Sequence, residues 1–221
     1  MTTQTKIQNP FLIHHKKPGL FNRFLVNSLK EKILLNDKHH KIRVSGLTNE
    51  IQTFRNETYA QKAPYLLSST HHKIVKEAEL DQRSFHFTGT FNHKLCSSLR
   101  LTTFPFESVA LFPHLKDDIE KRFSHYIELN RLISKNQNQT IFLFMQAAIY
   151  AQELGYEGFI SICTKSNFNK FKKFGVLAQS DLVKIEYRNN QEYYIISSNF
   201  TKLNILGLIT YFIMRHFGKV R

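Results

Sequence analysis

The chain has 221 residues, of which 42% are hydrophobic and 13% aromatic, so it can build one ordinary core and is not a disordered polymer. Its formal net charge of +14 favours anionic partners such as nucleic acid, anionic lipid or an acidic protein. The two cysteines match neither a metal-binding spacing nor a disulfide framework, and they fit a reducing cytoplasm.

The first part of the chain, residues 1–40, is expected to be an extension that carries an amphipathic helix. After the break at Pro18 and Gly19, apolar side chains recur at helical spacing from about residue 20 to residue 35. The N-terminus is polar and has no apolar region of the kind found in signal peptides.

Residues 41–47 are expected to form a short strand. A helix follows, because Asn49 can cap it and Gln52 stands three residues further on. After Pro64 the pattern is poorly determined as far as about Lys76.

The spacing of apolar residues then changes from helical to alternating. The expected elements are a hairpin of two strands (83–91 and 95–103), a proline-punctuated stretch, a third strand (125–134), an apolar helix (140–154), a buried strand (159–164) and a short helix (167–174). A second hairpin (182–188 and 192–197) and an amphipathic helix (199–217) complete the chain.

This order predicts an α/β fold of the α+β kind, with a mixed sheet covered by helices on both faces. Residues 41–198 are expected to form the main domain, and residues 199–221 a C-terminal helix packed on or beside it. The longest apolar run, Leu203–Met214, is shorter than the roughly 20 residues that span a bilayer. We therefore expect a cytoplasmic protein whose C-terminal helix can touch a membrane surface.

Four short motifs occur in order along these elements. Glu128 and Arg131 form a Glu-x-x-Arg motif on the third strand, and Arg100 with Leu101 ends the strand before it. Arg55 and Tyr59 lie one turn apart on the first helix of the domain, and Asp81 precedes the hairpin. Together they resemble the motifs of acyl-homoserine-lactone synthases and N-acyl amino acid synthases, which have the acetyltransferase-like (GNAT) three-layer αβα fold.

The resemblance implies an autoinducer-synthase-like N-acyltransferase, with a role for each of these residues. Glu128 would be the general base, and a bulge would bring Arg131 to its side. Arg100 would anchor a substrate carboxylate and Asp81 the acceptor amine. The remaining substrate contacts would be Arg55 and Tyr59, as a flexible lid, and Thr164, as a donor to the acyl carbonyl or pantetheine.

The donor is expected to be an acyl group on the phosphopantetheine thioester of an acyl carrier protein. Acetyl-CoA enzymes have a glycine-rich phosphate loop after the third strand, and residues 134–139 contain no glycine. The positive net charge suits an acidic carrier, and a basic, Phe-interleaved helix offers it a docking surface. The proposed docking residues are Lys165, Lys170, Lys172 and Lys173. We expect no permanently bound cofactor and no metal.

Other interpretations remain open at this stage. Within enzymes, the alternative is an acetyl-CoA-dependent N-acetyltransferase. From another class, the net charge suggests a nucleic-acid-binding protein, although the sequence contains no recognised binding motif. Glu128 and Arg131 could also form an ion-pair network with a purely structural role. The acyl length, the acceptor and the oligomeric state are not fixed by the sequence.

Overall fold

The computed structural model describes residues 27, 40–135, 137–172, 175–203 and 205–206. The expected helix over residues 20–35 and most of the expected helix over 199–217 lie outside the described residues, as does Lys173. Residues 200–203 and 205–206 are helical, at the start of the latter.

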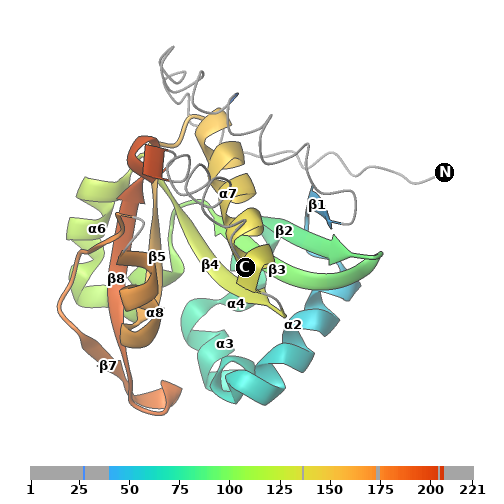
Figure 1. Ribbon diagram of the computed structural model, residues 1–221. Helices are drawn as coiled ribbons and strands as arrows, with labels where there is room; N and C mark the ends of the chain where they lie inside the picture. The colour runs from blue at the N-terminus through green and yellow to red at the C-terminus, as the bar shows by residue number, and fades with distance from the viewer. Residues whose placement is uncertain (1–26, 28–39, 136, 173–174, 204, 207–221) are drawn as a thin grey trace.

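A single mixed sheet forms the centre of the molecule (Figure 1). Its strands are β1 (His40–Ser45), β2 (Ser84–Phe91), β3 (Lys94–Thr102), β4 (Tyr126–Ser134), β5 (Gly158–Thr164), β6 (Leu177–Ala178), β7 (Val183–Ile185) and β8 (Gln191–Asn199). They follow the order β1-β2-β3-β4-β5-β8-β6, and β7 also pairs with β8. Only the β4–β5 pair is parallel among the described strands.

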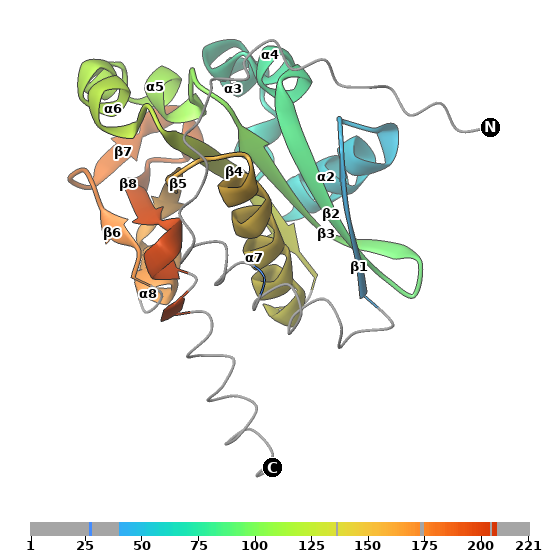
Figure 2. The ribbon, with the colours of Figure 1, turned by 90° about the horizontal axis from the view of Figure 1, so that it is seen from above.

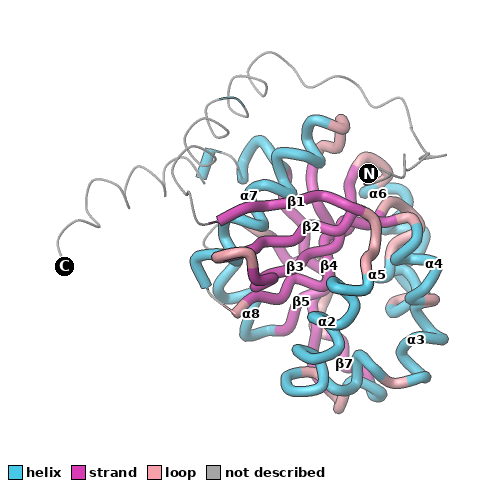
Figure 3. The backbone as a smooth tube through the Cα atoms, turned by 90° about the vertical axis from the view of Figure 1, so that its right-hand side faces the viewer, coloured by secondary structure: helices cyan, strands magenta, loops and turns pink. Residues whose placement is uncertain are grey.

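Helices cover both faces of this sheet. The α-helices are α2 (Asn49–Lys62), α3 (Ser69–Val75), α4 (Glu77–Gln82), α5 (Glu107–Leu111), α6 (Lys116–Phe123), α7 (Gln137–Glu153) and α8 (Lys165–Phe171), and the 3₁₀ helices are η1 (Pro64–Leu67), η2 (Pro113–Leu115) and η4 (Glu186–Arg188). Helices α7 and α8 lie on one face and α3–α6 on the other (Figure 2). Seen from the side, β1 to β4 lie next to one another in order (Figure 3). The expected three-layer αβα arrangement is confirmed.

The first helix of the domain starts differently from the prediction. Thr48, and not Asn49, is the N-cap, because its hydroxyl accepts the N–H of Ile51. The stretch that the sequence left undetermined contains two short helices, α3 and α4. They are separated by Lys76, whose left-handed φ of 52° ends one helix before the next begins.

The two faces of the central strands have different chemistry. Phe87, Leu99 and Ile127 point toward α7 and belong to a large apolar core. The residues that alternate with them are polar and fully buried, among them His86, Arg100 and Glu128. Alternation along a strand puts these side chains on the opposite face, toward α2–α5. The sequence thus separates an apolar layer from a charged one across the same three strands.

Strands β4 and β5 separate soon after they meet. They pair only through Tyr126–Gly158, Ile127–Phe159 and Glu128–Ile160, although both strands continue further. The two strands therefore diverge, and Glu128 is the last residue of β4 that pairs with β5. Among the described residues, the facing edges of β4 and β5 do not pair with each other beyond this point, as a ligand that binds between two strand edges requires.

Candidate functional site

A β-bulge in β4 brings Glu128 and Arg131 to the same face of the sheet. The register between β3 and β4 shifts so that Arg131 and Leu132 together oppose one residue of β3. Arg131 takes a left-handed φ of 56°, which fits such a bulge. Without the bulge, two residues three positions apart would face opposite sides. The sequence-based expectation of a bulge here is confirmed.

Glu107, the first residue of α5, lies at the centre of a buried charged cluster. Its carboxylate accepts hydrogen bonds from Arg100 Nη2 at 2.7 Å and Arg188 Nη2 at 2.9 Å. Arg131 Nη2 lies 3.3 Å from Oε1, and Asn130 Nδ2 donates to Oε2 at 3.2 Å. Burial alone would raise the pKa of Glu107, but the neighbouring guanidinium groups outweigh burial and hold this pKa below its ordinary value. Glu107 is therefore an anion with several cationic partners.

Two carboxylates of α4 complete the ring around Arg100. Glu77 Oε1 and Asp81 Oδ1, one turn apart, each accept from Arg100 Nη1 at 2.9 Å. Glu77 Oε2 also accepts from Arg131 Nη2 at 2.6 Å, and Asp81 from Arg55 Nη1 at 3.2 Å. Both Nη atoms of Arg100 thus bind protein carboxylates, whereas its Nε is buried without a hydrogen-bond partner among the described residues. The anchoring of a substrate carboxylate by Arg100 stays a prediction.

Glu128 is the carboxylate with a raised pKa. It is completely buried, and its two oxygens accept the backbone N–H groups of Glu107 at 2.5 Å and Ser108 at 2.8 Å. Burial, and then the neighbouring charge of Glu107, raise the pKa of Glu128 to about 7. Glu128 therefore fastens the start of α5 and can change its charge near neutral pH.

His71 of α3 lies between two of the arginines. Arg131 Nη2 is 2.7 Å from its Nε2 and Arg188 Nη2 is 3.3 Å from its Nδ1. Burial, and then the positive charge of Arg131, lower the pKa of His71 to about 3. The ring is neutral at physiological pH, so one ring nitrogen can accept a hydrogen bond from an arginine.

The charged cluster is costly to bury. It combines four guanidinium groups with four carboxylates, from Arg55, Arg100, Arg131, Arg188, Glu77, Asp81, Glu107 and Glu128. Desolvating paired charges often cancels their attraction, and apolar residues of similar size can give equal stability. A dense cluster of this kind, with a carboxyl that titrates near neutrality, marks a candidate functional site.

Arg55 and Tyr59 do not form an exposed lid. Both are buried on the face of α2 that packs toward the cluster, and the guanidinium of Arg131 lies 6.0 Å from the centre of the Tyr59 ring. Arg55 Nη2 and the Tyr59 hydroxyl are buried without a hydrogen-bond partner among the described residues. Buried polar atoms are normally satisfied, so this pair indicates where a bound molecule could supply the missing groups.

The other predicted residues lie on the far side of the β4–β5 divergence. Thr164 caps α8, because its hydroxyl accepts the N–H of Asn167 at 3.4 Å. Lys165, Lys170 and Lys172 are exposed on or beside this helix, while Phe168 and Phe171 pack against the apolar core. The lysines therefore form a solvated basic surface above partly buried aromatic rings.

Three members of the cluster were missed by sequence reasoning: Glu107, Arg188 and His71. Glu107 follows a Phe-Pro-Phe stretch whose proline is typical of a loop. Arg188 stands at the end of a predicted hairpin strand, where an arginine is normally exposed. Glu77, a fourth such residue, likewise has no role in the sequence-based prediction. The i, i+4 spacing of Glu77 and Asp81 was the available signal, since it puts both on one helix face.

Comparisons with known proteins agree with this architecture. No family model matches the chain, and neither does any curated protein. Among solved structures, the AHL synthase LasI matches with a TM-score of 0.56 and 12% identity, over 77% of this chain and 95% of LasI. The CoA-dependent acyl-homoserine lactone synthase BjaI matches with a TM-score of 0.57 and 14% identity, over 76% and 87% of the two chains.

FeeM, an N-acyl amino acid synthase from uncultured soil microbes, matches with a TM-score of 0.59 and 7% identity, over 74% of this chain and 92% of FeeM. At such identities the likeness establishes the fold alone. The chain therefore has a GNAT-like fold resembling that of these synthases, as the sequence predicted. Among the described residues, no helix is long and apolar enough to cross a membrane.

Proposed function

We propose that the chain is an N-acyltransferase that moves an acyl group from a thioester to a small amine. The observation that carries this proposal is the position of Glu128 at the point where β4 and β5 separate, next to the bulged Arg131. A buried carboxyl with a pKa of about 7 can accept a proton at neutral pH. The GNAT-like fold gives this arrangement a known chemical precedent.

The donor is proposed to lie between the diverging strands. A phosphopantetheine arm carries two amides, which can hydrogen-bond to the strand edges left free beyond Glu128 and Ile160. This path would bring the thioester to the end of the paired region, beside the charged cluster.

In the proposed reaction, the acceptor nitrogen attacks the thioester carbonyl. A C–N bond forms, the C–S bond breaks, and the thiolate leaves. Glu128 takes the proton that the amine loses. Its oxygens already accept two backbone N–H groups, but each retains a second lone pair for this purpose. Arg131 is proposed to keep the surrounding carboxylates ionised, because its guanidinium binds Glu77.

The acceptor is proposed to lie between α2 and the cluster. Arg55 Nη2 and the Tyr59 hydroxyl are buried donors without a hydrogen-bond partner among the described residues, so they are proposed to bind an acceptor carboxylate, and Arg100 Nε is a further unpartnered donor. Asp81 attracts the amine electrostatically, although it already binds Arg55 and Arg100. This supports an amino acid or a related zwitterion as the acceptor.

An acyl carrier protein is the proposed source of the thioester. The exposed Lys165, Lys170 and Lys172 gather at α8, next to the end of β5, where a carrier-borne arm would arrive. A carrier holds its arm covalently, so its docking can replace the contacts that free CoA makes through phosphate groups. BjaI, a neighbour in fold, is CoA-dependent, and CoA is therefore the alternative donor to test.

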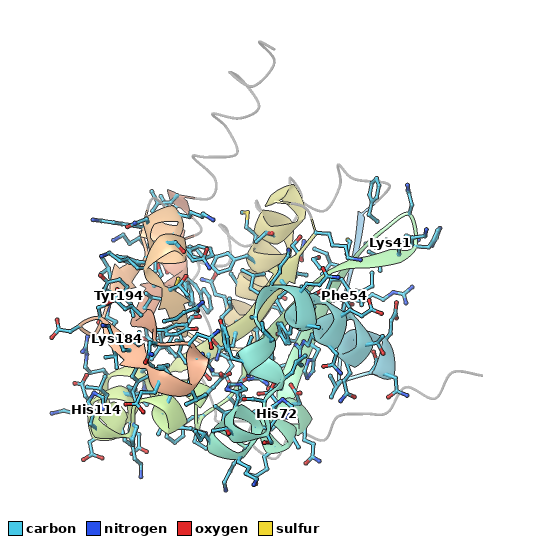
Figure 4. The ribbon with its side chains drawn as sticks, turned by 90° about the horizontal axis from the view of Figure 1, so that it is seen from below. Lys41, Phe54, His72, His114, Lys184 and Tyr194 are labelled. Carbon is cyan, nitrogen blue, oxygen red and sulfur yellow. The ribbon has the colours of Figure 1, made fainter. Side chains whose placement is uncertain are left out.

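The experiment compares acyl transfer from matched acyl-carrier and acyl-CoA donors. We expect at least about tenfold higher kcat/KM with the carrier, a difference of roughly 1.4 kcal/mol. Changing Lys170 and Lys172 to Glu should remove most of this preference, and added salt should weaken it. Lys41→Glu is the matched control, because Lys41 is exposed on β1 at the opposite edge of the sheet (Figure 4).

Equal use of both donors, unchanged by the lysine variants, would contradict the carrier proposal and favour a CoA-dependent N-acyltransferase. Transfer of acetyl groups alone would identify the chain as an acetyl-CoA-dependent N-acetyltransferase. Absence of acyl transfer from every donor would overturn the enzymatic proposal.

A further inference from the structure

Arg188 reaches the charged cluster from a distant part of the fold. It ends η4 in the β7–β8 hairpin, where Asn189 and Asn190 make the turn with left-handed φ values of 57° and 54°. Its side chain is 5% exposed, and Nη2 binds Glu107 at 2.9 Å and approaches His71 at 3.3 Å. Arg188 therefore links the hairpin to α5 and α3.

This link crosses the region where the sheet divides. Strands β4 and β5 share only three residue pairs, so β1–β4 and β5–β8 are two halves joined by a short paired region. The hairpin belongs to the second half. The segment around Glu107 packs its apolar side chains against that half, because Phe106 and Phe112 cluster with Ile185 of β7. Glu107 itself reaches the first half, where its carboxylate binds Arg100 of β3 and its backbone N–H binds Glu128 of β4. Figure 4 shows α3, at His72, between α2, at Phe54, and the hairpin strand β7, at Lys184.

A second polar bridge lies beside Arg188, nearer to solvent. The Tyr193 hydroxyl lies 3.1 Å from the Tyr65 hydroxyl of η1 and 2.9 Å from Gln191 Oε1, and the Tyr65 hydroxyl donates to Gln191 Oε1 at 3.1 Å. This bridge joins η1 to β8 through groups other than Arg188.

The contacts of Glu107 indicate what Arg188 does. Glu107 Oε2 binds Arg100 and Oε1 binds Arg188, while the backbone N–H of Glu107 binds the carboxylate of Glu128. Oε1 is shared by Arg188 at 2.9 Å and Arg131 at 3.3 Å, so loss of Arg188 removes the shorter of these two contacts. The backbone N–H of Glu107 donates to Glu128 at 2.5 Å, so a shift of the Glu107 backbone would move a hydrogen-bond donor of Glu128.

We propose that Arg188 is a positioning residue for acyl transfer, which fixes Glu107 and thereby aligns Glu128 across the divided sheet. This inference rests on the proposed function, in which Glu128 takes the proton. It adds a residue outside the Glu-x-x-Arg motif, and it couples the half of the sheet that carries the carrier-docking helix to the half that carries the base. Arg188 itself touches neither substrate.

The test uses the full chain with two changes: Arg188→Lys and Arg188→Met. Arg188→Met leaves Glu107 less compensated, so Arg188→Lys, which keeps a positive charge beside Glu107, guards against a simple failure to fold. Arg122→Met is the matched control, because Arg122 forms an exposed pair with Asp118 at 3.0 Å on α6.

We expect Arg188→Met to lower kcat at least tenfold while the donor KM changes less than twofold. Lysine at position 188 should restore most of kcat, because it keeps a charge for Glu107, and Arg122→Met should have no effect. Hydrogen exchange in residues 64–71 and 186–191 should rise at least tenfold in Arg188→Met and stay unchanged in the control.

Two results would overturn the inference: full kcat in a folded Arg188→Met variant, or a rise in donor KM that accounts for the whole loss. Unchanged hydrogen exchange around the hairpin would also overturn it, with or without an activity assay. If the wild-type chain transfers no acyl group, the proposed function fails by itself, and the exchange data then decide whether Arg188 fixes the cluster.

Discussion

Replacing Glu128 with Gln tests the charge state of the site through stability alone. The carboxyl is completely buried, and its pKa rises from 4.5 to about 7 on folding. At about 1.4 kcal/mol for each unit, this difference corresponds to about 3 kcal/mol of pH-dependent stability. The protonated form is the one that the fold favours.

The direction of the effect follows from the raised pKa. The contribution of Glu128 to stability is fully present below pH 4.5, the ordinary value, and is lost as the pH rises through about 7. Glutamine cannot ionise, so the Glu128→Gln variant lacks this loss. Between pH 5 and pH 8, the stability of the wild type should therefore fall by roughly 2–3 kcal/mol relative to that of Glu128→Gln.

Urea unfolding of both chains at pH 5, 6, 7 and 8 measures this difference, because titrating groups distant from Glu128 contribute equally to both. Glu79→Gln is the matched control, since Glu79 lies on the exposed face of the short helix that carries Glu77. If the difference in unfolding free energy between the wild type and Glu128→Gln stays constant from pH 5 to pH 8, the raised pKa of Glu128 is refuted.

Three further changes test the packing around the site. Glu107→Gln should cost about 3–5 kcal/mol in urea unfolding, because it leaves buried guanidinium groups uncompensated, and a cost below about 1 kcal/mol would contradict the central place of Glu107. Gly158→Ala should lower Tm and reduce the free energy of unfolding by about 1–3 kcal/mol, because a Cβ there would lie 2.4 Å from the Ser198 carbonyl oxygen. An unchanged Tm would mean that the paired strands β5 and β8 move apart at no cost. Thr164→Ala should reduce the free energy of unfolding by about 1 kcal/mol, because α8 loses its N-cap. Amide hydrogen-exchange rates in α8 equal to those of the wild type would argue against this cap.

The order of elements was predictable because long periodic segments dominate it. The apolar alternation in β2 and β3 and the length of α7 left little choice of topology. Helices α5 and α6 were missed because prolines surround them and α5 has only five residues. Such helices are fixed by tertiary contacts, here the hydrogen bonds from the start of α5 to Glu128, and not by local propensity.

The candidate site was predictable where residues share an element. The Glu-x-x-Arg motif lies on one strand, so a single bulge was enough to unite Glu128 and Arg131. Arg188 and Glu107 are 81 positions apart, and no local pattern connects them. The three carboxylate partners of Arg100 were not predictable for a related reason, because they come from α4 and α5, which the sequence did not reveal as helices.

The central claim is that this chain joins acyl groups to amines with Glu128 as the base. Mass spectrometry of lipid extracts from cells that express the wild-type chain or Glu128→Gln tests it most directly. We predict acylated amines in the wild-type extract that fall at least about a hundredfold in the variant, at equal levels of folded protein. The same acylated amines at equal levels in both extracts would contradict the role of Glu128, and none in either extract would contradict the acyltransferase itself.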